Sequence, residues 1–239
     1  SWTEVADMNT GRAGTTNGGT QTAGICAGGP PSATTSEEWD GTSWTAGAAI
    51  PASRGVGGWV GASTSDITGA AGLTGGSTAI NTTIRYNGTA WSTGNNMTRN
   101  AQYGPDGATA TTGSTALIMG GKWYPSPPGS TNVTELYDGT SWSPVNSMNT
   151  PRYYAGGSGT STAAMECAGI DYPSPGVIGF TELYDGTSWA EGGDVVNARG
   201  YGNASGGQSG TILASGGSPV QLFSEEYALP PAIKTFTAT

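Results

Sequence analysis

A short string that occurs in four copies along the chain constrains its fold more than any other feature. The first copy, at residues 37–44, reads Glu-Glu-Trp-Asp-Gly-Thr-Ser-Trp, and the later copies end at Trp91, Trp142 and Trp189. A shortened fifth copy, Glu225-Glu226-Tyr227, lies near the C-terminus. Together with Trp2, the repeated tryptophans are 42, 47, 51 and 47 residues apart. Units of this length are typical of repeat folds such as β-propellers.

Two further landmarks appear in the same order in each unit, which excludes a chance alignment. An arginine follows each repeated tryptophan, ten residues later in four units and eight residues later in the unit of Trp91. A double-glycine step, replaced by Ala-Gly in one unit, then follows the arginine. The repeat positions are Trp2, Trp44, Trp91, Trp142 and Trp189; Arg12, Arg54, Arg99, Arg152 and Arg199; and Gly28-Gly29, Gly75-Gly76, Gly120-Gly121, Ala168-Gly169 and Gly216-Gly217.

Each unit can be divided into four short β-strands. Glycine accounts for 42 of the 239 residues, and no stretch carries apolar residues at helical spacing over three turns. We place the first strand after the arginine, the second before the double glycine and the third at Glu-x-Tyr. The Asp-Gly pair then predicts a tight hairpin turn, after which the tryptophan opens the fourth strand.

The two ends of the chain complement each other. Residues 2–8 have the pattern of a fourth strand, whereas residues 199–227 contain the first three strands of a unit without a fourth. We therefore predict that residues 1–239 form a single all-β domain, a five-bladed β-propeller with four-stranded antiparallel blades. The N-terminal strand 2–8 is expected to join the C-terminal blade and close the ring, which removes two exposed edges. Residues 228–239 are expected to form a C-terminal tail.

In these features the chain resembles the kelch repeat family over essentially its whole length. The matching elements are the double glycine after the second strand, the Glu-x-Tyr of the third and the tryptophan of the fourth. The five residues from Tyr137 to Trp142 are fewer than kelch repeats usually have at this point. The resemblance therefore implies a kelch-like propeller with a tighter turn between its third and fourth strands.

The repeated arginines and tryptophans admit a structural and a functional interpretation. The five arginines could form an anion-binding ring. An arginine that recurs beside a recurring glutamate, however, favours a charge pair or a carbonyl-capping contact within each blade. The tryptophans could form a platform for sugars, but packing between neighbouring blades is the commoner role of a tryptophan at a repeat position.

Composition argues against several classes of function. The chain has 8 lysines and arginines against 17 acidic residues and contains no histidine. Without a basic cluster, binding to nucleic acid is disfavoured, and without a long apolar run so is membrane insertion. The absence of histidine removes Ser-His and Cys-His dyads and imidazole metal sites, and the predicted first strands carry almost no acids for glycoside hydrolysis. We predict no enzymatic activity, catalytic residue, metal or cofactor.

The two cysteines are predicted to be buried free thiols. Cys26 and Cys167 both lie in second strands, at positions that we take as equivalent, in blades one and four. These blades are not neighbours, so their Cα atoms are expected to lie beyond the roughly 7 Å that a disulfide can span.

Residues that break the repeat are the best candidates for a binding site. Two connections between second and third strands are long, residues 122–129 and 170–176, and both contain Tyr-Pro-Ser-Pro. Proline stiffens such loops and lowers the cost of ordering them on binding. The candidate ligand-binding residues are Trp123, Tyr124, Asp171 and Tyr172. Simple packing of the two loops on each other is the alternative interpretation.

The strings Tyr-Asp-Gly-Thr-Ser-Trp and Met-Asn-Thr-Pro-Arg resemble kelch-like propellers of marine bacteriophages, which occur as tail- or capsid-associated structural proteins, often in many copies. This resemblance implies a component of the virion that mediates protein–protein or host-surface contacts. Its partners would be other virion or surface proteins and host glycans. A second hypothesis is an extracellular, lectin-like carbohydrate-binding domain of a secreted or cell-surface protein. A propeller-fold oxidase or glycosidase ranks third.

Overall fold

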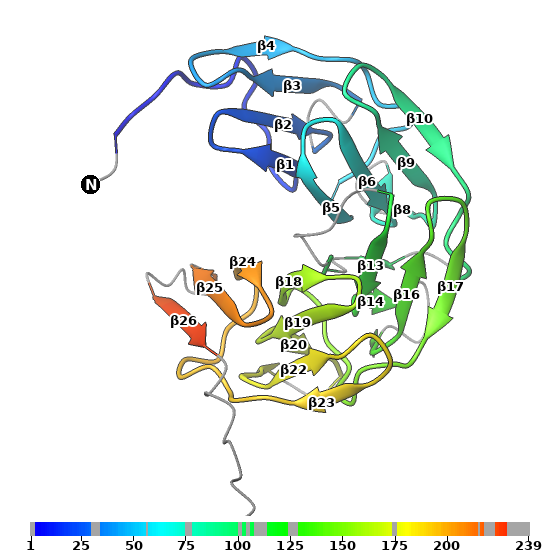
Figure 1. The fold of residues 1–239 in the computed structure, drawn as a ribbon, viewed down its shortest axis with the longest axis vertical. Helices are drawn as coiled ribbons and strands as arrows, with labels where there is room; N and C mark the ends of the chain where they lie inside the picture. The colour runs from blue at the N-terminus through cyan, green and yellow to red at the C-terminus, as the bar shows by residue number, and fades with distance from the viewer. Residues whose placement is uncertain are drawn as a thin grey trace, which may run out of the picture.

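The structure, a computed structural model, consists of five small antiparallel sheets arranged around a common axis (Figure 1). It describes residues 3–29, 34–55, 57–74, 78–99, 102–103, 106–107, 114–123, 129–173, 176–214, 216–217 and 223–228. The regular elements in this part of the chain are all strands. Within the same residues, no helix has the length and apolarity that crossing a bilayer requires.

Each repeat unit forms one blade, with its strands side by side in the predicted order. Blade 1 contains β1 (Thr16–Thr20), β2 (Ala23–Ala27), β3 (Ser36–Trp39) and β4 (Trp44–Ala46). Blade 2 contains β5 (Gly58–Ser63), β6 (Asp66–Ala70), β9 (Thr83–Tyr86) and β10 (Trp91–Gly94). Blade 3 contains β12 (Asp106–Gly107), β13 (Ala116–Met119), β16 (Thr134–Tyr137) and β17 (Trp142–Val145). Blade 4 contains β18 (Gly156–Thr160), β19 (Ala163–Cys167), β22 (Thr181–Tyr184) and β23 (Trp189–Glu191), and blade 5 contains β24 (Asn203–Gly207), β25 (Gly210–Ala214) and β26 (Ser224–Ala228).

The turn between the third and fourth strands of a blade has the predicted hairpin geometry. In blade 3, Asp138 Oδ1 accepts hydrogen bonds from the backbone nitrogens of Thr140 and Ser141, each 2.8 Å long. Gly139 has a φ of 95°, a left-handed conformation that glycine adopts without a steric penalty. The equivalent glycines, Gly41, Gly88 and Gly186, have φ values between 92° and 96°. The recurring Asp-Gly or Asn-Gly is therefore explained by the turn itself.

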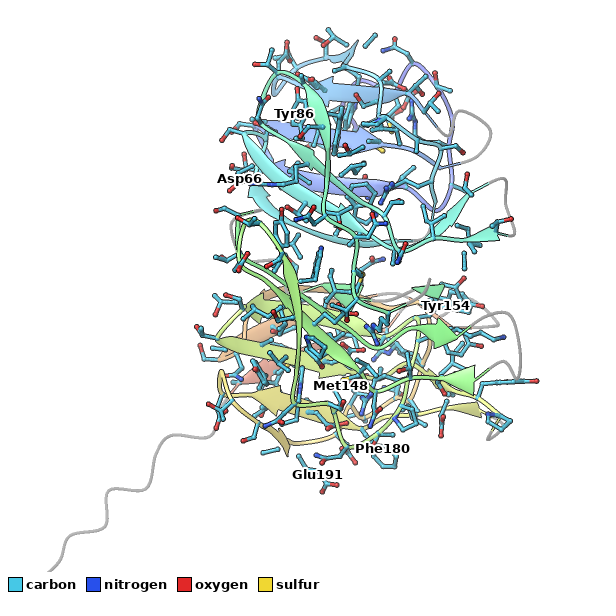
Figure 2. The ribbon with its side chains drawn as sticks, turned by 90° about the vertical axis from the view of Figure 1, so that its right-hand side faces the viewer. Asp66, Tyr86, Met148, Tyr154, Phe180 and Glu191 are labelled. Atoms are coloured by element: carbon cyan, nitrogen blue, oxygen red, sulfur yellow. The ribbon has the colours of Figure 1, made fainter. Side chains whose placement is uncertain are left out.

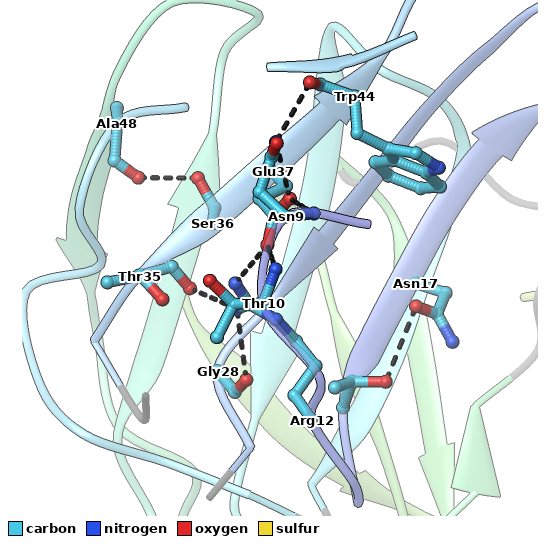
Figure 3. A network of polar contacts seen from close by, with 11 residues as sticks. Asn9, Thr10, Arg12, Asn17, Gly28, Thr35, Ser36, Glu37, Trp44 and Ala48 are labelled. Carbon is cyan, nitrogen blue, oxygen red and sulfur yellow. Dashed lines mark hydrogen bonds and ion pairs between the residues drawn. The ribbon is translucent and has the colours of Figure 1, made fainter. Parts of the chain in front are cut away.

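In four blades, the repeated arginine forms an ion pair with the glutamate on the third strand of its own blade. Arg12 donates to Glu37 Oε1 at 2.7 Å and to the Thr35 carbonyl at 2.9 Å (Figure 3). The same carboxylate accepts the backbone nitrogens of Asn9 and Thr10 at 2.7 and 3.1 Å. The other ion pairs of this kind are Arg99–Glu135, Arg152–Glu182 and Arg199–Glu225. These contacts are the charge pairs that the repeat predicts, and each also anchors the segment that enters the blade.

In blade 2, the repeated arginine binds backbone carbonyls instead of a glutamate. Ile84 occupies the position of the repeated glutamate, and Arg54 donates instead to the carbonyls of Gly69, Ala71 and Thr82 and to the Thr82 hydroxyl. Arg54 is 1% exposed. Burial without a carboxylate partner lowers its pKa to about 10.

The tryptophans that open strands β10, β17 and β23 pack between neighbouring blades, as the sequence predicts. Trp142 of blade 3 belongs to a buried cluster with Val60 and Ala70 of blade 2. Trp91 and Trp189 are buried in the corresponding clusters at the junctions of blades 1 and 2 and of blades 3 and 4. Trp44 is half-buried beside Trp39, with 5.5 Å between the ring centroids. Trp2 lies outside the described residues.

The glycine landmarks need two corrections. The pair with left-handed φ that follows the second strand of blade 2 is Ala71-Gly72, with φ values of 59° and 101°, and not Gly75-Gly76. Gly75 and Gly76 lie outside the described residues. In blade 5, Gly216 corresponds to Gly72, so it is the second residue of the pair and not the first. An added Cβ at Gly216 would approach the Gly200 carbonyl, and one at Gly72 would approach the Gly55 carbonyl. Sequence spacing alone could not identify these residues, because the pair is defined by its left-handed backbone conformation.

The thiol prediction is confirmed, but the two positions are not equivalent. Both cysteines are free and buried. Cys26 lies opposite Glu37, whereas Cys167 lies opposite Thr181, one residue later in the strand. The residue of blade 4 equivalent to Cys26 is Glu166, which lies opposite Glu182.

The ring is open between blades 5 and 1, where Figure 1 shows a gap between the two sheets. Among the described residues, β26 pairs only with β25, and residues 3–8 form no strand. Thr3 and Val5 line the same open pocket as Trp39 and Trp44 of blade 1, and Val5 is 62% exposed. Within the described part of the chain, the pairing predicted between residues 2–8 and the last blade is therefore not seen.

Candidate functional site

The two long loops singled out in the sequence meet on one face of the propeller. In the first loop, β14 (Lys122–Trp123) pairs with β15 (Gly129–Ser130), and in the second, β20 (Ile170–Asp171) pairs with β21 (Gly176–Val177). Further small strands extend this face, namely β7 (Leu73–Thr74), β8 (Thr78–Ala79) and β11 (Gln102–Tyr103).

Hydrogen bonds between Ser130 and the second loop hold the two loops together. The Ser130 hydroxyl donates to Asp171 Oδ1 at 2.6 Å and accepts from the Tyr172 backbone nitrogen at 2.7 Å. The Ser130 nitrogen donates to the Tyr172 carbonyl at 2.9 Å. The loops therefore pack on each other, as the structural alternative predicted, and this packing also holds Asp171 and Tyr172 in a defined position on the face.

Lys122 lies between two tyrosine rings on this face. Its ammonium is 4.5 Å from the ring centroid of Tyr172 and 5.3 Å from that of Tyr153. A cation within about 6 Å of an aromatic face is attracted by the quadrupole of the ring. The Tyr172 side chain is 40% exposed, so this cation–π pair is presented to solvent rather than enclosed in the core.

A ladder of three tyrosines continues from this pair toward the inner strands of blades 4 and 5. The ring centroids of Tyr153 and Tyr154 are 5.1 Å apart, and those of Tyr154 and Tyr201 are 4.3 Å apart. Tyr201 is 51% exposed. Figure 2 shows Tyr154 on the face of the disc opposite to the one that carries Asp66. We call Lys122, Tyr153, Tyr154, Tyr172 and Tyr201 together the tyrosine face.

Two members of the ladder have a backbone conformation that is costly for a tyrosine. Tyr154 and Tyr201 have φ values of 50° and 59°. Each lies two residues after a repeated arginine, where blade 1 has Gly14 with a φ of 59°. A non-glycine residue held in this region costs on the order of 1 kcal/mol, and such strain concentrates at functional sites. The strained backbone directs both rings into the ladder at the entrance to the inner strands.

Only part of the predicted site can be placed. Asp171 and Tyr172 lie together on the tyrosine face. Trp123 is located by its backbone alone, which pairs with Gln102 and Gly129, and Tyr124 lies outside the described residues.

Four members of the tyrosine face were not predicted from the sequence, namely Lys122, Tyr153, Tyr154 and Tyr201. The signal that could have found the last two is a tyrosine at the second position after the repeated arginine, where the other blades have Gly14, Val56 and Ala101.

The chemistry on this face suits binding. It offers flat aromatic surfaces, one ammonium and the Asp171 carboxylate. The described residues contain no group of three histidine, cysteine, aspartate or glutamate side chains that could hold a metal. Sugar rings, proline rings and aromatic side chains are the ligands that stack on exposed tyrosines.

The class that the fold defines is a five-bladed β-propeller. No model of a known protein family matches the chain, and no curated protein matches its sequence significantly.

Replacing Tyr201 with glycine is expected to change the free energy of unfolding by less than about 1 kcal/mol, in either direction. The substitution relieves the left-handed backbone and removes a ring that is half exposed, so two small effects oppose each other. Urea denaturation followed by tryptophan fluorescence measures the change. A loss of 3 kcal/mol would show that Tyr201 serves the core and would remove it from the candidate site.

Proposed function

We propose that the chain is a non-enzymatic recognition module whose tyrosine face contacts a partner surface. The observation that carries the proposal is the pair of tyrosines held with left-handed φ and stacked at 4.3 Å, with Tyr201 half exposed. A fold that needed only packing at this position could use glycine, as blade 1 does. The kelch-like, phage-like repeat favours a virion component, tail- or capsid-associated, that makes protein–protein or host-surface contacts, and the virion would be its location.

A carbohydrate-binding, lectin-like role is the second candidate. It is favoured by the Asp171 carboxylate beside the exposed ring of Tyr172, since sugars are commonly held by an aromatic face and polar groups at its edge. In that case the protein would be secreted or displayed at a cell surface.

Two measurements distinguish the virion component from the lectin. The labelled protein is applied to a glycan array, and its position in particles purified from a producing culture is determined by immunogold microscopy. A virion component is expected to occupy a defined position in the particle, and a lectin is expected to bind defined glycans. Absence from particles together with no bound glycan would contradict both.

Binding in either setting is expected to fall at least about tenfold in Tyr172→Ala and Tyr201→Gly, because each removes an exposed ring from the tyrosine face. Phe180→Ala is the matched control. Its ring is 49% exposed, and Figure 2 shows it away from Tyr154. Equal loss in the control and the two face variants would show that the tyrosine face is not the binding surface.

A further inference from the structure

Lys122 is the one cation in the described part of the chain that is neither fully buried nor paired with an acid. Five arginines form ion pairs with aspartate or glutamate. Arg54, which is 1% exposed, binds backbone carbonyls instead. Lys122 is half-buried, and its described side-chain contacts are with two tyrosine rings. In a chain with a net charge of −9, the tyrosine face therefore presents a localised positive charge.

The ammonium of Lys122 has unused hydrogen-bond donors. An ammonium carries three N–H donors and no acceptor. Its nitrogen lies 4.5 Å from the ring centroid of Tyr172 and 5.3 Å from that of Tyr153, and none of the donors has a hydrogen-bond acceptor among the described residues. The two rings hold the charge in place, which lowers the entropy that a flexible lysine loses on binding. A ligand that places an anionic oxygen beside Tyr172 therefore gains a charge-assisted hydrogen bond.

Asp171 sets the opposite requirement. Its Oδ1 accepts the Ser130 hydroxyl at 2.6 Å, whereas its Oδ2 accepts no hydrogen bond from the described residues. Because an ionised carboxylate only accepts, a ligand has to bring a donor such as a hydroxyl to this position. The same charge disfavours a second anionic group there. A ligand that complements both residues thus carries an anion for Lys122 and hydroxyl donors for Asp171, next to a flat aromatic ring.

We propose that the tyrosine face binds an acidic saccharide, that is, a sugar with a carboxylate or sulfate group. Lys122 binds the anionic group, Asp171 accepts a hydroxyl of the sugar, and the apolar face of the sugar ring stacks on Tyr172, which is 40% exposed. A neutral sugar leaves the ammonium without an acceptor, and an acidic peptide offers carboxylates but few hydroxyl donors. This inference rests on the recognition role proposed above and names its ligand.

Two pairs of saccharides that differ in charge test the proposal. The probes are oligogalacturonate and its methyl ester, for a carboxylate, and dextran sulfate and dextran, for a sulfate. Their dissociation constants are measured by biolayer interferometry on the immobilised full chain. At low ionic strength, the charged member of one pair is expected to bind at least about tenfold more tightly than its neutral counterpart, and to weaken as salt is added. The pair that shows the preference identifies the anion.

Substitutions at Lys122 connect this preference to the site. Lys122→Met keeps an aliphatic side chain between the rings and removes the charge, so the preference for the charged saccharide is expected to disappear. Lys122→Arg keeps the charge and is expected to retain the preference. Arg85→Gln is the matched control and is expected to leave the preference unchanged, because Arg85 is paired with Asp66, which lies on the opposite face of the disc (Figure 2).

Equal affinity of the parent chain for charged and neutral saccharides, or a preference that persists in Lys122→Met, would overturn the proposal. Tighter binding of polyglutamate than of every saccharide would also overturn it, by making an acidic peptide the ligand. If charged and neutral saccharides bind alike and Tyr172→Ala abolishes both, the recognition role of the tyrosine face stands and only the acidic specificity falls. Failure of all four saccharides to bind removes the ligand class, whereas the position of the protein in particles tests the recognition role separately.

Discussion

Replacing Arg152 with leucine is expected to lower the free energy of unfolding by about 3–5 kcal/mol, the cost of leaving one partner of a buried ion pair without its counterion. Arg152 and Glu182 are 0% and 1% exposed and 2.7 Å apart. Arg152 also donates to the carbonyls of Ala168 and Phe180, which would lose their partner. Since a domain is stable by only about 5–15 kcal/mol, this one change removes a large share of the total.

The matched control for this prediction is Arg85→Leu. The Arg85–Asp66 pair has a similar distance, 3.0 Å, but its side chains are 30% and 26% exposed. Solvent screens such a pair, so the loss is expected to stay below about 1 kcal/mol. Urea denaturation of both variants gives the comparison. Equal losses in the two would show that burial does not set the value of the repeated arginine.

Replacing Glu166 with leucine is expected to stabilise the protein, and most strongly above pH 8. Glu166 is fully buried in β19, and neither of its carboxylate oxygens has a hydrogen-bond partner. Burial raises its pKa to about 8, and the nearby Arg152 only partly offsets that effect. At the equivalent position blades 3 and 5 have Ile118 and Leu213, so an apolar side chain fits the repeat.

The pH dependence follows from the direction of this shift. The native state holds the Glu166 proton up to about pH 8, whereas the unfolded chain releases it near the ordinary pKa of 4.5. The native state therefore binds more protons between these values, and stability falls as the pH rises through the window, by several kcal/mol in total. Chemical denaturation at pH 5, 7 and 9 measures the slope.

Glu166→Leu is expected to remove this contribution to the slope, and Glu166→Gln to remove it without changing the shape of the side chain. The two variants together separate charge from packing. A slope that persists in both would mean that other acids cause the pH dependence, and that Glu166 keeps its charge in the folded protein through Arg99 and Arg152.

The candidate site was only half predictable. Tyr172 and Asp171 stood out because they interrupt the repeat within long loops. Tyr154 and Tyr201 did not stand out in the sequence. Their role depends on left-handed φ values, which place the two ring centroids, from different blades, 4.3 Å apart. Lys122 could not be assigned to the site either, because its aromatic partners, Tyr153 and Tyr172, are 31 and 50 residues away in the sequence.

The sequence by itself determined the blades. The periodic tryptophan, arginine, glutamate and Asp-Gly each make a contact within one unit or with its neighbour, so their spacing specifies strand order, turn type and ion pairing. The tertiary structure alone decided which carboxylate lacks a partner, how two distant loops join, and that a cavity of about 100 Å³ lies between blades 4 and 5. These features depend on the register between strands and on contacts between blades and loops that are distant in the sequence. Local spacing does not encode them, because a shift of one residue exchanges the two faces of a strand.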